Sequence, residues 1–538
     1  MPVQHFLSAM GRCPLFPQYP SDYVNNNFWC GYGRFHYEAI AVCSLSIIIV
    51  GFQNGISSYI FPPAQCELNL TSLELGFLNV SFLVGGTVSC FLWGLIADNH
   101  GRKKVLIFAH LCNLIVTMVS AVNPYTATLV SCRFINGFLM GAPGSLMYTY
   151  IAEFQPSTHR FRTVCILGLF FIASWLFLPV LAYLILPVKI YYNFKNIFII
   201  SPWRVFLLLI AIPEILVCLW LTRLPESPKF YIARGNHKKT LKILKKIYSA
   251  NSGKSAELFP VKTIICEVYN NLQNSEVMIS GKTARVLKEV TNQIRKLFQK
   301  PFLTKTFVIS AIMFSNMFGL FGLGLWLPEL FIKFEKYHLL HPNSTVSIEE
   351  LSSLPQNREK SCQPSFDQSV IISTVATGST ALIFNGISCL ISTRVSSRNI
   401  TLVLTFLGGI CAACIYWLTT SLQNLIVSCI FQATMLTANM SITSIAVELF
   451  PTSIGGMAVC FVICAGRVGA AISNVVFAFL MDDYCQFAIF AVAFVQIIGG
   501  ILCFLVPSQK KCRAETVKSC EETKLNNFEL AAINNKSI

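Results

Sequence analysis

Apolar runs of about twenty residues recur along the whole chain, and they constrain its fold more than any other feature. A run of that length spans the hydrocarbon core of a bilayer as an α-helix, whereas a soluble domain cannot bury so many of them. Hydrophobic residues make up 54% of the chain and charged residues only 12%, about half the usual charged share of a soluble protein. The sequence therefore predicts an all-α membrane protein that crosses the bilayer many times.

The apolar runs divide into two groups of six, which predicts two six-helix bundles over 39–222 and 305–507. An internal repeat supports this duplication, because the segments 153–156 (EFQP) and 448–451 (ELFP) follow the fourth and the tenth run. The expected spans are 39–61, 74–97, 104–123, 126–152, 162–186 and 203–222, followed by 306–331, 369–391, 400–419, 422–447, 456–481 and 486–507.

The segment 223–304 between the two groups is strongly basic. Counted as far as Lys305, it carries 17 Lys and Arg residues against five acidic residues, which is a net charge of +12. Such an excess marks a cytoplasmic loop, so this loop and the polar tails 1–38 and 508–538 are expected in the cytoplasm. Lysines interleaved with leucines and isoleucines predict a basic amphipathic helix within the loop. That helix would lie on anionic inner-leaflet lipids or against the bundle, and a calmodulin-binding helix fits the pattern less well.

The same topology places the loop 332–368 outside the cell or in a vesicle lumen. The loop holds a sequon at Asn343, far enough from the membrane for glycosylation. Cys66 and Cys362 both fall in outer loops, where a disulfide is permitted, and two free thiols are an equal alternative. Most of the 21 cysteines lie inside apolar runs, where cysteine acts as a small buried hydrophobe. The sequence shows no zinc spacing, nucleotide loop or nucleophile arrangement, so no metal, cofactor or enzymatic activity is expected.

The most specific pattern, GLIADNHGRKK, begins at Gly94, between the second and third runs. Gly94 is expected to permit close contact between helices, and Gly101 to support a tight turn. Asp98 would lie near Arg102 for charge pairing, and Lys103 follows. The stretch resembles the major facilitator signature G-x-x-x-D-x-x-G-R-[KR].

Other stretches resemble elements of the same superfamily. Arg133 and Gly137 fit the R-x-x-x-G element of its fourth helix. Glu153 and Pro156, followed by Arg160, are similar to the end of that helix in the sugar, organic-ion and synaptic-vesicle branches.

Within the superfamily, the chain resembles the synaptic vesicle glycoproteins and related proteins from about residue 30 to 507. The stretches that carry this resemblance are 33–37 (GRFHY), 63–68 (PAQCEL), 133–154 and 226–251, together with the element PESP at 225–228. The resemblance implies the twelve-helix major facilitator fold, in which helices 1, 4, 7 and 10 line a central cavity. It implies no particular substrate, because many members of the family have none assigned.

The second half departs from the superfamily pattern. Arg394 and Ser397 stand where the repeated signature has Asp and Gly, and Gly455 stands where a basic residue should follow Glu448 and Pro451. In the family these charges form salt bridges at the inner face that favour the outward-open state. The resemblance therefore implies a lopsided inner gate, or a protein that does not cycle as a typical transporter.

Polar residues inside the spans are the candidate site, because they are costly in lipid. A gating role is expected for Arg133, with pairing to a backbone carbonyl as the structural alternative. Arg467 would either meet an anionic group of the substrate or pack between the two halves. Glu214 is expected to be structural or to face the lipid interface. The cavity candidates are Gln53, Asn54, Tyr59, Asn136, Tyr148, Asn316, Trp326, Gln432, Asn439 and Arg467.

The span 39–61 holds no acidic residue, which argues against proton symport. The amide and aromatic candidates suit a neutral, anionic or bulky amphipathic solute. The leading interpretation is secondary transport of a small organic solute by alternating access, as uniport or exchange, by a monomer in the plasma membrane or a vesicle membrane. The alternative is a receptor or scaffold of vesicles that does not transport. Nucleic acid is not an expected partner, because the excess charge is concentrated in one loop.

Overall fold

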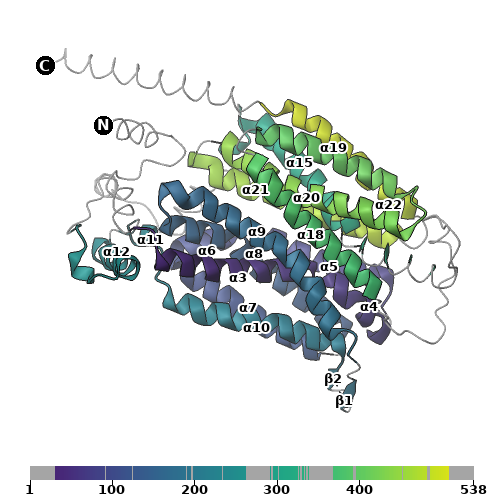
Figure 1. Cartoon of the computed structure of the whole chain (residues 1–538), viewed down its shortest axis with the longest axis horizontal. Helices are drawn as coiled ribbons and strands as arrows, with labels where there is room; N and C mark the ends of the chain where they lie inside the picture. Colours follow the sequence, from purple (N-terminus) through teal and green to yellow (C-terminus); the bar gives the residue numbers. More distant parts are fainter. Residues whose placement is uncertain are drawn as a thin grey trace.

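A computed structural model of the chain describes residues 31–261, 291, 295–337 and 368–507, apart from short gaps within these ranges. This part is nearly all helical, and nine of its helices are long and apolar enough to cross a membrane. Figure 1 shows two packed groups of helices, purple to blue for the first half and green to yellow for the second. The predicted all-α membrane architecture is thereby confirmed.

In the first half, each of the first two expected spans consists of two consecutive helices, which separate near Ile56 and Cys90. The spans that follow are single helices whose ends lie within several residues of the expected ones. The helices of this half are α3 (Arg34–Gly55), α4 (Ser57–Leu68), α5 (Ser72–Ser89), α6 (Leu92–His100), α7 (Arg102–Val122), α8 (Thr126–Phe154), α9 (Ser157–Ile185) and α10 (Pro202–Arg223).

The second half repeats this pattern of long apolar helices. Its elements are α15 (Phe302–Phe321), α18 (Gln368–Ile391), α19 (Ser397–Ile415), α20 (Ser421–Leu449), α21 (Thr452–Leu480), α22 (Cys485–Leu502) and the short 3-10 helix η2 (Cys503–Leu505).

A small antiparallel hairpin was not expected from the sequence. The strands β1 (Tyr192–Phe194) and β2 (Phe198–Ile200) pair with Tyr192 opposite Ile200. Aromatic and β-branched residues favour extended backbone, which accounts for strands in a segment that is too short for another helix. Figure 1 places the hairpin at the end of the first half that lies opposite the basic loop.

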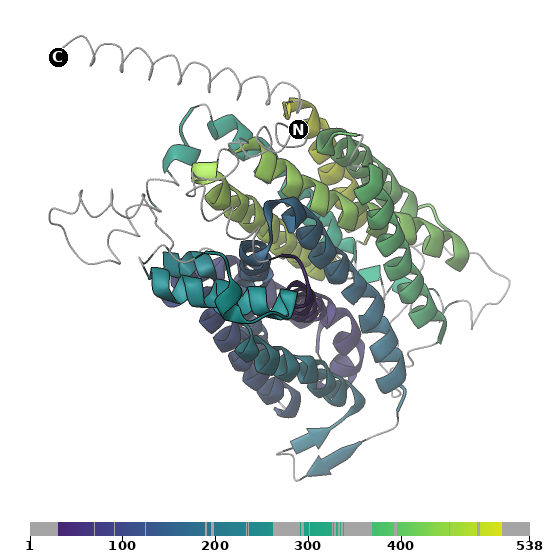
Figure 2. The same cartoon turned by 60° about the vertical axis from the view of Figure 1, so that its left-hand side comes forward.

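The expected amphipathic helix in the basic loop is present as α12 (His237–Ser252), after the short helix α11 (Pro228–Ile232) and before η1 (Ala256–Leu258). Leu244 and Ile247 on its apolar face are buried, and Gly253 ends it with a left-handed backbone at φ 69°. Figure 2 shows the helix lying across the end of the first bundle. The apolar face is therefore covered by protein, as one of the two predicted placements requires.

The two halves touch along two helix pairs, α5 with α21 and α9 with α18. Small residues allow these close approaches. A side chain at Gly76 would overlap Ala478, and a Cβ at Gly378 would lie 2.6 Å from the carbonyl oxygen of Trp175. Both contacts join residues from different halves, so they must change whenever the halves move relative to each other.

Candidate transport site and inner gate

Arg133 on α8 is buried against helices α3 and α4, with only 2% of its surface exposed. Its guanidinium donates to the side-chain oxygen of Gln53 (3.2 Å), to the carbonyl oxygen of Gln53 (3.1 Å) and to the hydroxyl of Ser57 (2.9 Å). Its Cζ lies 4.5 Å from the ring centroid of Phe82. Arg133 therefore makes the contact with a backbone carbonyl that the structural alternative predicts. Its gating role stays a prediction.

A polar seam continues from Arg133 along α7, where His110, Asn113 and Thr117 share one helix face at spacings of three and four residues. The ring nitrogen Nε2 of His110 lies 2.8 Å from the hydroxyl of Ser46, and Gln53 donates to the hydroxyl of Thr117 at 3.4 Å. Helix α3 is therefore tied to α7 by neutral groups and to α8 by the guanidinium of Arg133.

Glu214 on α10 joins this seam, because its Oε1 accepts a hydrogen bond from Asn113 at 2.5 Å. The residue is fully buried, which excludes the lipid interface and agrees with the structural alternative. Helix α10 is apolar on nearly every side, and the sequence therefore did not reveal which face points inward. The second carboxyl oxygen has no hydrogen-bond partner in the described chain and lies near the side chain of Gln53.

Five of the cavity candidates share an unusual property, a buried polar atom with no hydrogen-bond partner in the described chain. Buried polar groups in proteins are nearly always hydrogen-bonded, so such atoms need water or a bound solute. The five residues are Asn136 on α8, Asn316 on α15, Trp326 shortly after α15, and Gln432 and Asn439 on α20.

Arg467 reaches from α21 in the second half to α5 in the first half. Its guanidinium donates to the carbonyl oxygen of Gly86, and a Cβ at Gly144 of α8 would lie 3.8 Å from its Nη2. The thiol of Cys90, at the end of α5, donates to the carbonyl oxygen of Cys460 on α21 at 3.6 Å in the same contact region. Arg467 therefore makes the packing contact between halves that the sequence allowed, and its role toward an anion stays a prediction.

The remaining cavity candidates lie in three different settings. Asn54 donates to the carbonyl oxygen of Val50 in its own helix at 2.7 Å. Tyr59 is buried, and its side chain lies near that of Thr374 on α18 in the other half. Tyr148 is half-buried at the margin of the main apolar core. Only Tyr59 of these three has a described polar neighbour in the other half.

At the inner face, Arg102 pairs with Glu153 at the end of α8, and the hydroxyl of Ser227 donates to the same carboxylate. The hydroxyl of Tyr150 donates to the carbonyl oxygen of Pro225 at 2.6 Å. The PESP element thus closes over the end of α8. All of these described partners belong to the first half, so these contacts brace that half.

Glu226 of the PESP element lies at the start of α7. Its Oε1 accepts hydrogen bonds from the backbone nitrogens of Lys103 (3.0 Å) and Ser227 (3.1 Å). A carboxylate at a helix N-terminus satisfies free N–H groups and complements the helix dipole. Gly101 has φ 98° directly before α7, and a Cβ there would overlap the Glu226 carboxylate. The tight turn predicted at Gly101 is confirmed.

The two other signature glycines differ from each other. A Cβ at Gly137 would overlap the carbonyl oxygen of Phe82 on α5, so this glycine permits close contact between α8 and α5. A Cβ at Gly94 would meet no atom within 4 Å, so the expectation of a close contact there is wrong. Pro156 precedes α9 directly as its N-terminal cap residue.

Several predicted residues lie outside the described residues or have side chains that are not described. They are Cys66, Asp98, Arg160, Asn343, Cys362, Arg394, Glu448, Pro451 and Gly455. Among the described residues, no group of three or more His, Cys, Asp or Glu residues is placed to hold a metal ion.

One polar cluster at the opposite end of the first half was missed. Glu67 at the end of α4 pairs with Arg204 at 2.9 Å and accepts a hydrogen bond from the indole of Trp203 at 2.7 Å. Arg204 is 1% exposed and also donates to the carbonyl oxygens of Ala121 (3.1 Å) and Asn123 (2.7 Å). The sequence did carry a signal for this cluster. Glu67 and Arg204 are opposite charges at the ends of apolar runs, and buried charges must be paired.

Comparison with known proteins agrees with this geometry. A family profile described as "Sugar (and other) transporter" matches residues 46–298. Synaptic vesicle glycoprotein 2B of Homo sapiens is 26% identical over 321 residues, which cover 57% of this chain and 47% of that protein. Synaptic vesicle glycoprotein 2A of Rattus norvegicus is 25% identical over 317 residues, covering 56% and 42%. The match therefore spans about half the length of these curated relatives.

Among solved structures, the xylose transporter XylE from E. coli in a partially occluded inward-open conformation matches with a TM-score of 0.63. The match covers 88% of this chain and 99% of that chain at 16% identity, so it shows the fold alone. These findings confirm both the predicted fold and the predicted resemblance. The chain is a multi-pass membrane protein with the major facilitator fold, and its sequence is similar to a sugar transporter profile and to the synaptic vesicle glycoproteins.

Proposed function

We propose that the protein carries a small neutral or anionic organic solute by alternating access, as a uniporter or exchanger, in the plasma membrane or a vesicle membrane. The observation that carries this proposal is the neutral surrounding of Arg133. A proton-coupled carrier needs a group that titrates as the carrier changes state. Gln53 and Ser57, which hold Arg133, do not titrate in the physiological range. The titratable groups of the same seam, His110 and Glu214, hydrogen-bond Ser46 and Asn113 and make no described contact with Arg133.

The unpartnered amide and indole groups support the solute class. Asn136, Asn316 and Gln432 each offer a buried polar atom without a partner in the described chain, which a hydroxyl-bearing or carbonyl-bearing solute would satisfy. Arg467 adds a positive charge at the contact between the halves. Such a set lacks the fixed carboxylate that recognises a small organic cation.

Uptake into proteoliposomes tests the proposal, with a neutral sugar, an organic carboxylate and a quaternary ammonium compound as solutes. We expect uptake of the first or second solute, none of the third, and no dependence on an imposed pH gradient. Arg133→Ala should reduce uptake by about tenfold or more, because it frees the contact between α8 and α3. Lys238→Ala removes a charge from an exposed position on α12 and should leave uptake unchanged.

Two results would contradict the proposal. If solute accumulation requires an inward proton gradient, the protein is a proton symporter and not a uniporter or exchanger. No uptake of any solute class by well-folded protein would favour the non-transporting scaffold.

A further inference from the structure

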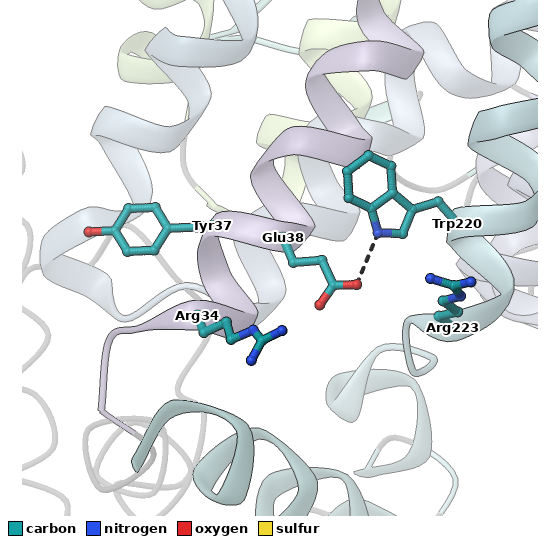
Figure 3. Close-up of a pocket in the computed structure, with 5 residues that line it drawn as sticks. All are labelled: Arg34, Tyr37, Glu38, Trp220 and Arg223. Atoms are coloured by element: carbon teal, nitrogen blue, oxygen red, sulfur yellow. Dashed lines mark hydrogen bonds between the residues drawn. The ribbon is translucent and has the colours of Figure 1, made fainter. Parts of the chain in front are cut away.

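A cavity of about 640 Å³ lies at the end of the first half that carries the basic loop. It lies beside Lys103 of the inner gate, whose ammonium group donates to the carbonyl oxygen of Thr222 at 2.8 Å. Figure 3 shows it between the first turn of α3, with Arg34, Tyr37 and Glu38, and the last turn of α10, with Trp220 and Arg223. By the charge asymmetry of the loops, this end is cytoplasmic. The cavity is therefore open at the level of the inner leaflet.

Two arginines approach the cavity from opposite walls, with Glu38 between them (Figure 3). Arg34 and Arg223 are both exposed, and neither guanidinium has a hydrogen bond or ion pair with the described residues. Glu38 is held in place because its Oε1 accepts a hydrogen bond from the indole nitrogen of Trp220 at 2.9 Å. Its other oxygen stays available. The cavity thus presents two positive groups and one fixed negative group.

The surroundings of the cavity add positive charge and an aromatic rim. Lys246 of α12 donates from its ammonium group to the carbonyl oxygen of Arg223 at 3.3 Å, which brings the basic face of α12 to the same edge. Tyr37 is 63% exposed, and Trp220 is half-buried. Tryptophan and tyrosine at the ends of spanning helices favour the headgroup layer of a bilayer. The position and charge together suit a lipid headgroup.

We propose that this cavity binds the headgroup of phosphatidylserine from the inner leaflet. That headgroup carries a phosphate, a carboxylate and a primary ammonium group, and so has one net negative charge. Arg34 and Arg223 match the two anionic groups, because guanidinium binds phosphate and carboxylate through paired N–H donors. Glu38 matches the ammonium group. The inner leaflet is the leaflet that holds anionic lipids of this kind.

The fixed carboxylate of Glu38 sets the selectivity among lipids. Phosphatidylglycerol and phosphatidylinositol have no ammonium group to pair with it. The quaternary nitrogen of phosphatidylcholine has no N–H to donate. Phosphatidylethanolamine has the ammonium group and phosphate but would leave one arginine without an anion. Phosphatidylserine should therefore bind more tightly than any of these four.

Native mass spectrometry of the purified full-length protein, titrated with each lipid, tests this order. Phosphatidylserine should bind about tenfold more tightly than phosphatidylglycerol, which has the same net charge. Arg34→Gln and Arg223→Gln should each weaken phosphatidylserine binding by about tenfold. Glu38→Gln should remove the preference, so that phosphatidylserine and phosphatidylglycerol bind alike. Glycerophosphoserine, the soluble headgroup, should compete, while inorganic phosphate at the same concentration should not.

Lys238→Gln is the matched control, because it removes one exposed positive charge from α12 outside the cavity. It should leave phosphatidylserine binding within about twofold of the native value. Equal binding of phosphatidylserine and phosphatidylglycerol by the native protein would overturn the proposal. So would a loss with Lys238→Gln as large as that with Arg223→Gln, because binding would then follow overall charge and not this cavity. Both results are independent of whether Glu38→Gln folds.

Discussion

The two halves of the molecule hold their helices together by different chemistry. In the first half, two ion pairs join helices at opposite faces of the membrane, Arg102 with Glu153 and Arg204 with Glu67. In the described part of the second half, no ion pair ties the helices, and the ties end on backbone carbonyl oxygens. The guanidinium of Arg398 donates to the carbonyl oxygens of Cys503 (3.1 Å) and Phe504 (2.9 Å). Gln496 on α22 donates to the carbonyl oxygen of Ser315 at 2.6 Å, and the Ser315 hydroxyl donates to the carbonyl oxygen of Val495 at 2.7 Å.

This difference predicts how much stability each half loses when a polar residue is substituted. Removing one member of a buried ion pair leaves the other charge buried without compensation, which costs more than losing a neutral hydrogen bond. The first half is therefore expected to tolerate substitutions at its faces poorly. The second half, tied near its middle by carbonyl contacts, should lose less stability from any single polar substitution.

The largest effect on stability is expected from Glu67→Ala. It leaves Arg204, which is 1% exposed, without its carboxylate and should reduce the free energy of unfolding by about 3 kcal/mol. Ser315→Ala in the second half should reduce it by about 1 kcal/mol. Thermal denaturation of the purified protein in detergent compares the two variants. Equal shifts of the midpoint would show that the charged and neutral ties do not differ.

Gly137→Ala should have the next largest effect. The added methyl group would overlap the carbonyl oxygen of Phe82, so α8 and α5 must move apart at a cost of about 1–3 kcal/mol. Gly94→Ala, in the other glycine-bearing motif of the first half, is its control, because a Cβ there meets no described atom within 4 Å. The control should change the thermal midpoint little. If both variants lose the same stability, the described contacts of the signature glycines are wrong.

Arg133→Ala should destabilise the protein by about 1 kcal/mol, although it removes a fully buried charge. The partners that remain, Gln53 and Ser57, are neutral, and no carboxylate is left unpaired. The loss of transport proposed above would then be separate from the loss of stability. A midpoint shift as large as that of Glu67→Ala would indicate an anionic partner for Arg133. Arg133 and Arg204 would then not differ in the kind of partner that holds them.

The smallest effect is expected from Glu214→Gln, which keeps the size of the side chain and removes the proton site. If transport is uniport or exchange, the variant should show the same dependence of uptake on pH as the native protein. Uptake measured across a range of external pH in proteoliposomes gives the comparison. A flattened pH profile in the variant would assign proton coupling to the buried carboxyl group beside Asn113.

Much of this architecture follows from sequence patterns that have a simple physical basis. Apolar runs of membrane-spanning length predict the helices, because every backbone polar group in lipid must be paired within the chain. Alternating lysines and leucines predict α12, whose apolar face is indeed buried. The turn at Gly101 follows from its place between two helices, and its φ of 98° shows why glycine is required there.

The partners of the charged residues could not be predicted in the same way. Arg102 pairs with Glu153 on another helix, whereas its expected contact with Asp98 stays a prediction because the Asp98 side chain is not described. The choice between a structural and a lipid-facing Glu214 stayed open because an evenly apolar helix gives no sign of its inward face. The pairing of Glu67 with Arg204 joins residues 137 positions apart in the sequence. Each of these contacts depends on how whole helices pack, which a single sequence does not specify.

The attachment of α12 has a consequence for the order of synthesis. Asn251 near its end accepts a hydrogen bond from the backbone nitrogen of Phe35 (3.0 Å) and donates to the carbonyl oxygen of Gly31 (2.9 Å). Together with the PESP contacts, this completes the inner face of the first half with residues before 262. Chains fold from the N-terminus as they leave the ribosome. These contacts of the first half can therefore form while α15 is still being translated, and the second bundle then assembles against helices that are already tied together.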